Sequence, residues 1–195
     1  DKILNLNKFN MKRLSNDFFN DTYLNDQLAC SSPHLILWMG NNINNAKNKF
    51  WKSFEIFVKS KYILSDDTSI QKYTHFQSMC SSHNDMIKNY HTHDNYICRL
   101  ELKNLMKNIE KFKSFGGFFL EFDIKKLSSL KEIINNNYQT LSYFGFFKKN
   151  LISEIKLNQL NGIDRIVPVG QTLDIDLIWD GFDIIKQLTR VVEVR

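Results

Sequence analysis

From residue 117 to the end of the chain, short apolar runs alternate with amphipathic stretches, and this alternation limits the fold more than any other feature of the sequence. Strands and helices that alternate in this way are typical of a parallel α/β sheet with right-handed crossovers. We therefore predict an α/β fold with a parallel sheet and flanking helices. The runs at 118–122, 140–144 and 165–169 predict strands, and the stretches at 127–135, 148–159 and 182–188 predict helices.

The first part of the chain carries longer helical patterns. Phe50, Phe54, Phe57 and Val58 recur at spacings of three and four residues, which is the spacing of one buried helix face. These side chains are therefore predicted to pack in the core. The remaining predicted elements are helices at 7–20, 43–62 and 69–90, strands at 34–39 and 96–102, and a final strand at 189–194.

The composition is that of a globular protein. The chain has 195 residues, 43% of them hydrophobic, which suits one domain with a substantial core. Its net charge of +5 comes from scattered lysines without a basic run, so a nucleic-acid partner is not predicted. No apolar stretch approaches the ~20 residues that span a membrane. The three cysteines lack a disulfide spacing, which indicates a reducing compartment, and we expect a cytoplasmic protein.

One cysteine lies in an unusual setting. Cys30 follows an amphipathic stretch, has small or polar neighbours, and precedes the apolar run 35–38. A structural cysteine normally lies within an apolar pattern, whereas a nucleophilic cysteine needs a partly open, hydrogen-bonding turn. The residues around Cys30 alone leave both interpretations open.

Three stretches, taken together, carry a resemblance that covers most of the chain. They are residues 20–33 around Cys30, residues 139–144, and residues 162–167 with a continuation through Gly170, Asp180, Gly181 and residues 188–192. In this order and spacing they resemble the LuxC-type long-chain fatty acyl-CoA reductases, which include the fatty-acid reductase of bacterial luminescence. That family is a branch of the aldehyde dehydrogenase superfamily.

The resemblance implies a fold and a reaction. The chain would be the C-terminal catalytic half, with the α/β fold of the aldehyde dehydrogenase catalytic domain. It would reduce an acyl-CoA thioester to an aldehyde with NADPH, through an acyl group carried on Cys30. A cysteine suits this reaction, because its thiolate is strongly nucleophilic and its thioester still accepts hydride. No metal is expected.

The resemblance also implies partners and an assembly. In luminescence systems such a reductase works beside an acyl-transferase and an acyl-protein synthetase. The family uses edge strands in oligomer assembly, so a homo-oligomer is expected and the strand at 189–194 would add to a neighbouring sheet.

The chain departs from the family in two ways. It begins without an initiator methionine, and the nucleotide-binding half, with most of the NADPH contacts, would precede it. Residues 1–195 are therefore interpreted as a single catalytic domain, a fragment that is weak or inactive alone, with a variable insertion at about 65–115. In addition, Trp179–Asp180 stands where the luminescence enzymes carry a His–Asp pair, which weakens the case for histidine-assisted proton transfer.

Several polar residues could support Cys30. Gln27 could shape the turn or hold a water, although a purely structural hydrogen bond is the simpler interpretation. Ser31 could donate to the thiolate or cap the loop, as could Ser32. His34 follows the cysteine by four residues and would face away from it in a strand. Asp180 is either a polar group of the site or an ordinary turn carboxylate.

Two other functions remain open at this point. The chain could be a non-catalytic binding or scaffolding module of the same fold, with an unreactive Cys30. It could also be a zinc-binding regulatory module, because two sulfurs and three imidazoles fall within 19 residues, although their spacing fits no standard finger. These five residues are Cys80, His83, His91, His93 and Cys98.

Overall fold

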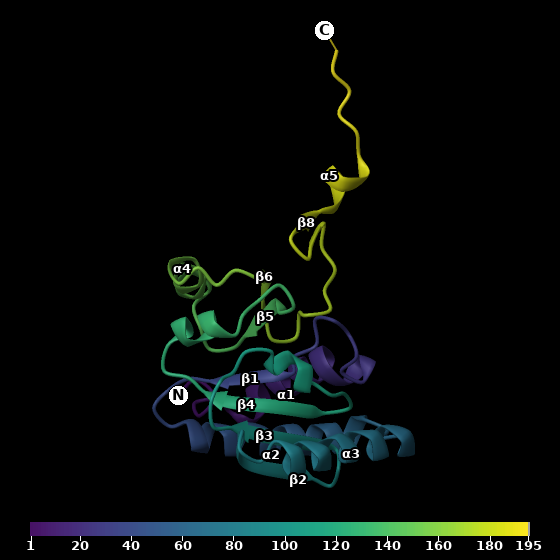
Figure 1. Ribbon diagram of the computed structural model, residues 1–195, viewed down its shortest axis with the longest axis vertical. Coiled ribbons are helices and arrows are strands. Elements are labelled where there is room, and N and C mark those ends of the chain that lie inside the picture. Colours follow the sequence, from purple (N-terminus) through teal and green to yellow (C-terminus); the bar gives the residue numbers. More distant parts are fainter. Residues whose placement is uncertain (195) are drawn as a thin grey trace.

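The computed structural model describes residues 1–194 and shows a mixed α/β fold with a mostly parallel main sheet (Figure 1). The α-helices are α1 (Lys8–Thr22), α2 (Ile43–Lys61), α3 (Asp66–Ser82), α4 (Lys148–Leu157) and α5 (Ile184–Leu188). The strands are β1 (Leu35–Trp38), β2 (Ile87–His93), β3 (Ile97–Leu102), β4 (Phe118–Asp123), β5 (Gln139–Tyr143), β6 (Ile163–Pro168), β7 (Ile178–Trp179) and β8 (Phe182–Asp183). Three short 3-10 helices are η1 (Tyr23–Asn25), η2 (Ile109–Phe112) and η3 (Leu127–Glu132).

The main sheet has the strand order β1-β4-β3-β2. Strands β1, β4 and β3 are parallel, whereas β2 is an antiparallel edge strand that forms a hairpin with β3. Strands β5 and β6 pair in parallel in a separate two-stranded sheet, and β7 and β8 form a small hairpin. The α/β prediction is therefore confirmed, but the strands divide between three sheets.

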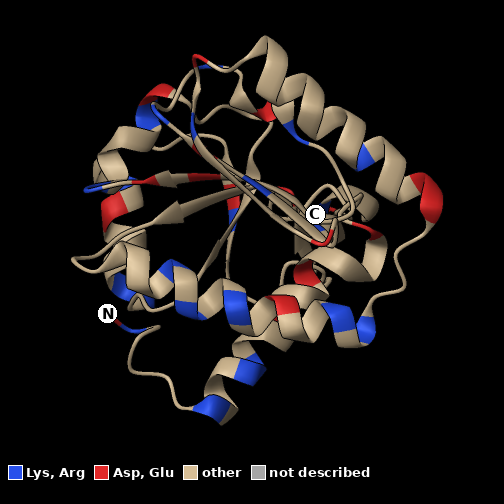
Figure 2. Cartoon of the chain, turned by 90° about the horizontal axis from the view of Figure 1, so that it is seen from below, with Lys and Arg blue, Asp and Glu red and all other residues tan. Residues whose placement is uncertain are grey.

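Helices cover both faces of the main sheet, and Figure 2 shows α2 and α3 on opposite sides of it. On one face, α1 and α2 bury an aromatic core in which Phe18, Phe50, Trp51 and Phe54 pack edge to face or stack, with Phe119 of β4 beneath them. The prediction that the helix 43–62 buries its phenylalanines is confirmed. On the other face, α3, η3 and α4 cover the second core.

The aromatic core contains a buried ion pair. Glu121 is fully buried in β4 and accepts hydrogen bonds from the indole N–H groups of Trp38 and Trp51, at 2.9 and 2.7 Å. The Arg99 guanidinium lies 2.9 Å from the same carboxylate and over the Trp51 ring. Burial raises the pKa of Glu121, and Arg99 and the indoles act in the opposite direction. The carboxylate therefore holds α2 and β1 to the centre of the sheet.

Four predicted elements differ from the structure. The helix predicted at 69–90 ends at Ser82, because residues 87–90 pair with β3 instead. The stretch 127–135 forms only the short 3-10 helix η3. The helix predicted from residue 182 begins two residues later, since 182–183 pair in the β7–β8 hairpin. Residues 189–194 form no strand, because within residues 1–194 they have no partner strand to supply hydrogen bonds.

The segment 65–115, where the resemblance is weakest, is not peripheral. It supplies α3, the hairpin β2–β3 and η2, and its strand β3 lies between β4 and β2 in the sheet. The side chains of Cys98 and Leu100 in this strand are fully buried. The main sheet therefore depends on this segment.

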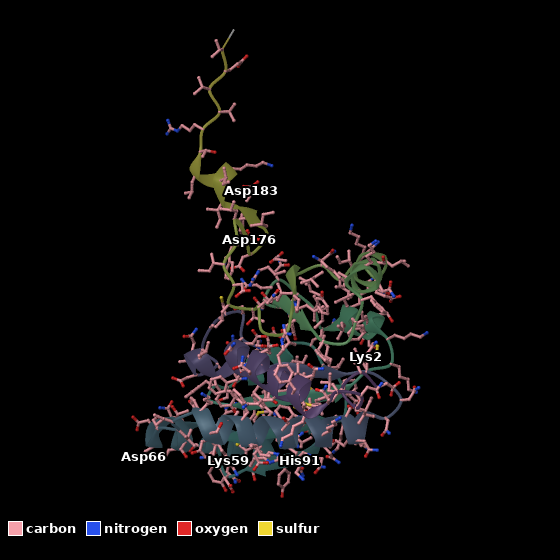
Figure 3. All side chains as sticks on the ribbon, turned by 180° about the vertical axis from the view of Figure 1, so that it is seen from behind. Lys2, Lys59, Asp66, His91, Asp176 and Asp183 are labelled. Carbon is pink, nitrogen blue, oxygen red and sulfur yellow. The ribbon has the colours of Figure 1, made fainter. Side chains whose placement is uncertain are left out.

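The C-terminal arm, residues 173–194, extends away from the two sheets (Figure 1), and Figure 3 shows Asp176 and Asp183 along it. Its base is fixed by Arg165 of β6, which donates to the carbonyl groups of Thr172 and Asp174 and lies 4.1 Å from the Trp179 ring centroid. In the part of the chain that the structure describes, no helix is long and apolar enough to cross a membrane.

Candidate functional site

Cys30 lies at the N-terminal edge of the main sheet, on the turn that joins η1 to β1. Its thiol is exposed, whereas Cys80 is partly buried and Cys98 is buried. The turn is compact, because the Leu28 N–H donates to the Asn25 carbonyl at 2.7 Å and the Ser32 N–H donates to the Ala29 carbonyl at 3.0 Å. Within residues 1–194 the backbone N–H of Cys30 donates no hydrogen bond. Cys30 therefore presents both a thiol and a free donor.

Gln27 fixes this turn to the sheet. Its side chain is buried, and its amide nitrogen donates to the carbonyl groups of Pro33 and Phe118 at 2.8 and 2.9 Å. Its amide oxygen accepts from the N–H groups of Gly117 and Phe118, both at 3.0 Å. The amide thus closes the loop 27–33 and binds it to the start of β4. The interpretation of Gln27 as a residue that shapes the turn agrees with this geometry.

A second group of contacts, made by Gly116 and Gly117 just before β4, supports the same turn. Gly116 donates from its N–H to the Asp26 carbonyl at 2.8 Å, and its own carbonyl accepts from the buried Lys72 ammonium at 2.6 Å. At Gly117, φ is +94° and a Cβ atom would lie 2.0 Å from the Tyr23 hydroxyl. The Gly116–Gly117 pair is therefore required for the Cys30 turn to lie this close to β4.

Cys30 lines a cavity of about 150 Å³, which we call the thiol pocket. Three buried polar atoms without a hydrogen-bond partner in residues 1–194 belong to residues that line it: Ser32 Oγ, His34 Nδ1 and Thr140 Oγ1. Buried polar atoms in native proteins almost always have a partner, so an unpaired group in a pocket wall indicates a bound water or ligand. Ser31 is also buried in this wall.

His34 is electrically neutral in this pocket at pH 7. Burial lowers the pKa of His34 to about 4, and the positive charge of Lys113 acts in the same direction. A hydrogen bond from the ring to the Ser114 backbone opposes both effects. A ring that donates one hydrogen bond and stays neutral presents its other nitrogen as an acceptor.

The opposite wall of the thiol pocket carries a carboxylate. Glu110 of η2 faces the amide groups of Asn135 and Asn137 and the hydroxyl of Tyr138, at 3.4 to 3.5 Å. Burial pushes the pKa of Glu110 upwards, but the hydrogen bonds to its carboxylate outweigh this and lower it. The carboxylate is therefore ionised at neutral pH, and it already accepts hydrogen bonds from these three side chains.

A second, larger cavity of about 510 Å³ lies at the other end of the parallel strands. We call it the apolar cavity, because side chains such as Ile36, Phe50, Leu127 and Leu151 line it. Six residues line both cavities, so the two cavities are adjacent between β1 and β5, and we call the pair the slot. The shared residues are Pro33, Leu35, Leu37, Leu130, Leu141 and Ser142.

The structure brings together only some of the residues singled out in the sequence. Cys30, Gln27 and Ser31 belong to one turn. Asp180 does not line the thiol pocket: it has a φ of +48° in the β7–β8 turn, and Asp164 lies against its neighbour Gly181. Trp179, its other neighbour, stacks on Arg165. A turn role accounts for Asp180 without a part in the site.

Sequence reasoning missed polar residues of the pocket wall, among them Glu110, Lys113, Tyr138 and Thr140. The last two adjoin or belong to the stretch 139–144, whose resemblance to the reductases was a signal that this segment matters. Nothing in the sequence near Lys113 indicates proximity to Cys30.

The five residues of the alternative zinc site do not come together. Cys98 faces the core under α3, and its neighbours along β3 face α2. His93 lies opposite Ile97 on the α2 side and contacts Glu55 at 2.8 Å, and His91 lies on the same side. Within residues 1–194 no group of three or more histidine, cysteine or acidic side chains could hold a metal ion.

Comparison of the chain with protein-family models and with curated proteins gives no match.

Proposed function

We propose that this chain is the thiol-bearing catalytic part of an NADPH-dependent acyl-CoA reductase of the LuxC type. The observation that carries the proposal is the position of Cys30: an exposed thiol on a turn held by Gln27, at a pocket that adjoins the larger apolar cavity. A thioester has a polar reacting centre and an apolar tail, and the two cavities match these two parts.

In the first step the Cys30 thiol loses its proton and the sulfur attacks the thioester carbon. The bond to the CoA sulfur breaks, CoA leaves as a thiolate that takes up a proton, and the acyl group stays on Cys30. NADPH would supply the hydride that converts this acyl group into an aldehyde and frees the thiol. The sequence has no glycine-rich dinucleotide motif, so this chain's part is to hold and present the acyl group.

The negative charge that develops on the carbonyl oxygen needs hydrogen-bond donors. The unpaired backbone N–H of Cys30 is one, and the unpaired hydroxyl groups of Ser32 and Thr140 in the same pocket are two more. Donors of this kind typically lower the barrier by about 3 kcal/mol each.

The acyl chain would extend from Cys30 past the shared residues Leu35, Leu37 and Leu141 into the apolar cavity. Cavities of some hundreds of cubic ångströms lined by apolar side chains are typical of small-molecule sites. The substrate class that follows is an acyl-CoA with an alkyl chain of medium or greater length.

Further parts of this proposal follow from the resemblance. They are an aldehyde dehydrogenase-like arrangement of the α/β domain, a cytoplasmic homo-oligomer, and acyl-transferase or acyl-protein synthetase partners. The exposed apolar side chains of the arm, such as Leu188, Val191 and Val192, are compatible with assembly.

Intact mass spectrometry after incubation with acyl-CoAs of increasing chain length tests the proposal. We expect a single acyl adduct on the chain and on Cys80→Ala, and none on Cys30→Ala. Alkylation at neutral pH should label Cys30 at least about 100-fold faster than Cys98, whose pKa burial raises to about 11. An adduct that persists in Cys30→Ala, or equal labelling of all three thiols, would favour the non-catalytic module instead.

A further inference from the structure

The outer end of the apolar cavity carries three exposed aromatic side chains. Phe144, Phe146 and Phe147 follow β5 and are 36%, 40% and 73% exposed. The first two also line the cavity. Aromatic rings that remain exposed together beside an apolar cavity usually mark a surface that another apolar phase covers.

Five lysines lie against these rings, next to them in the chain, or next to residues of the same cavity wall. Lys2 lines the cavity, its ammonium lies 5.7 Å from the Phe147 ring centroid, and Figure 3 labels it. Lys125 and Lys126 lie between two residues of the cavity wall, and Lys148 and Lys149 follow Phe147 directly. All five are exposed, and within residues 1–194 none forms an ion pair. Acidic residues near them include Asp1, which also lines the cavity, and Asp123, which precedes Ile124 and pairs with Lys47.

The start of α4 adds positive potential at the same place. The N-cap residue Phe147 has no side-chain cap, and the first turn contains no acidic residue but has Lys148 and Lys149. A helix N-terminus already has a partial positive charge and unpaired N–H groups, so two lysines there are unfavourable without an anion. A phosphate group bound at the N-terminus of α4 would accept hydrogen bonds from these N–H groups and balance the positive charge.

We propose that this surface, which we call the Phe–Lys rim, docks onto an anionic phospholipid membrane. Its residues are Lys2, Lys125, Lys126, Phe144, Phe146, Phe147, Lys148 and Lys149. The rings would enter the boundary between headgroups and acyl chains, and the lysines and the α4 N-terminus would face lipid phosphates. A phospholipid joins an anionic head to an alkyl tail, and the rim joins a cationic surface to an apolar cavity.

Vesicle sedimentation tests the inference with the chain itself. We expect binding to vesicles that contain phosphatidylglycerol, weaker binding as salt rises above about 0.1 M, and little binding to phosphatidylcholine alone. Lys148→Gln with Lys149→Gln should lower the partition coefficient about 30-fold. Phe146→Ser with Phe147→Ser should lower it at least about tenfold.

A matched control changes a lysine and an apolar residue elsewhere. Lys61→Gln with Ile63→Ser alters the far end of α2, where Ile63 is 92% exposed, and should leave binding within about twofold. Equal effects of control and rim variants, or no binding to anionic vesicles, would overturn the proposal. The double lysine variant keeps the test sound if the phenylalanine variant fails to fold. Cys30→Ala should bind vesicles like the parent chain, so vesicle binding and the proposed reaction fail independently.

Discussion

The two ends of the slot between β1 and β5 differ in chemistry. At the N-terminal edge of the strands, the thiol pocket is small and contains Cys30, unpaired hydroxyl groups and a neutral imidazole. At the C-terminal edge, the apolar cavity is more than three times as large, and lysines and exposed aromatic rings surround it. Under the proposed function, the thiol pocket would hold the reacting centre, and the apolar cavity would face the surface where an apolar ligand enters or leaves.

The two ends also differ in how their side chains are held. The Cys30 turn is tied to the sheet by buried side chains, with Gln27 and Lys72 contacting backbone groups at Pro33, at residues 116–118 and at Tyr96. Around Phe146 and Lys148, by contrast, the side chains are exposed. A reacting group has to be positioned closely, whereas a docking surface has to be accessible.

We expect the largest effect from a substitution that fills the boundary between the two cavities. Leu141→Trp places a bulky ring among the residues shared by both cavities. We expect acylation of Cys30 by a long-chain acyl-CoA to fall about 100-fold while acetylation is retained, as measured by intact mass. Leu141→Met, which conserves volume, should change neither rate by more than about twofold. Equal loss of both reactions would show that the substitution disturbs Cys30 itself and that the slot does not hold the acyl chain.

The second prediction concerns the hydrogen bonds that hold the Cys30 turn to the sheet. Gln27→Ala removes four hydrogen bonds and leaves buried N–H and carbonyl groups unpaired, so the free energy of unfolding should fall by about 3 kcal/mol or more. Denaturant unfolding measures this loss. Gln77→Ala on the exposed face of α3 is the matched control and should stay within about 0.5 kcal/mol. A loss as small as that of the control would contradict the role assigned to Gln27.

The third prediction uses pH to probe the imidazole of the thiol pocket. In the unfolded chain His34 titrates near its ordinary value of about 6.5, whereas its pKa in the folded chain is about 4. Between these values the unfolded chain binds the proton and the folded chain does not, so stability falls as pH drops from about 6.5 to about 4. This residue accounts for at most about 3 kcal/mol of the loss.

Unfolding of His34→Gln at a series of pH values measures the effect. The substituted chain should lose less stability than the parent between pH 7 and pH 4.5. Parallel curves for the two proteins would show that the imidazole titrates normally and is not held neutral by the pocket.

The smallest effect has opposite signs for stability and reactivity. Ser32→Ala removes a buried hydroxyl that lacks a partner, so the free energy of unfolding should stay the same or rise by up to about 1 kcal/mol. The rate of Cys30 acylation should nevertheless fall about tenfold if the hydroxyl stabilises the developing oxyanion. Ser128→Ala, on the exposed side of η3, should change neither quantity. An unchanged acylation rate in Ser32→Ala would remove Ser32 from the proposed donors.

Much of the fold was predictable because local periodicity decides it. The helix predicted at 43–62 appears as α2 (Ile43–Lys61), since its apolar spacing matches one buried helix face. The strands predicted at 34–39 and 118–122 appear as β1 and β4. The error at 87–90 arose because Ile87 and Tyr90 fit a helical spacing as well as a strand, and pairing with β3 selects the strand.

For the site, local chain connectivity is enough to place Cys30, Gln27, Ser31 and Ser32 together, because a few residues of chain cannot separate them. The packing of distant elements brings Thr140 to the same pocket as Cys30 and keeps Asp180 out of it. The same holds for the slot, whose walls come from β1, η3 and β5. A cavity is a property of how elements pack, and packing depends on contacts between residues that the sequence places far apart.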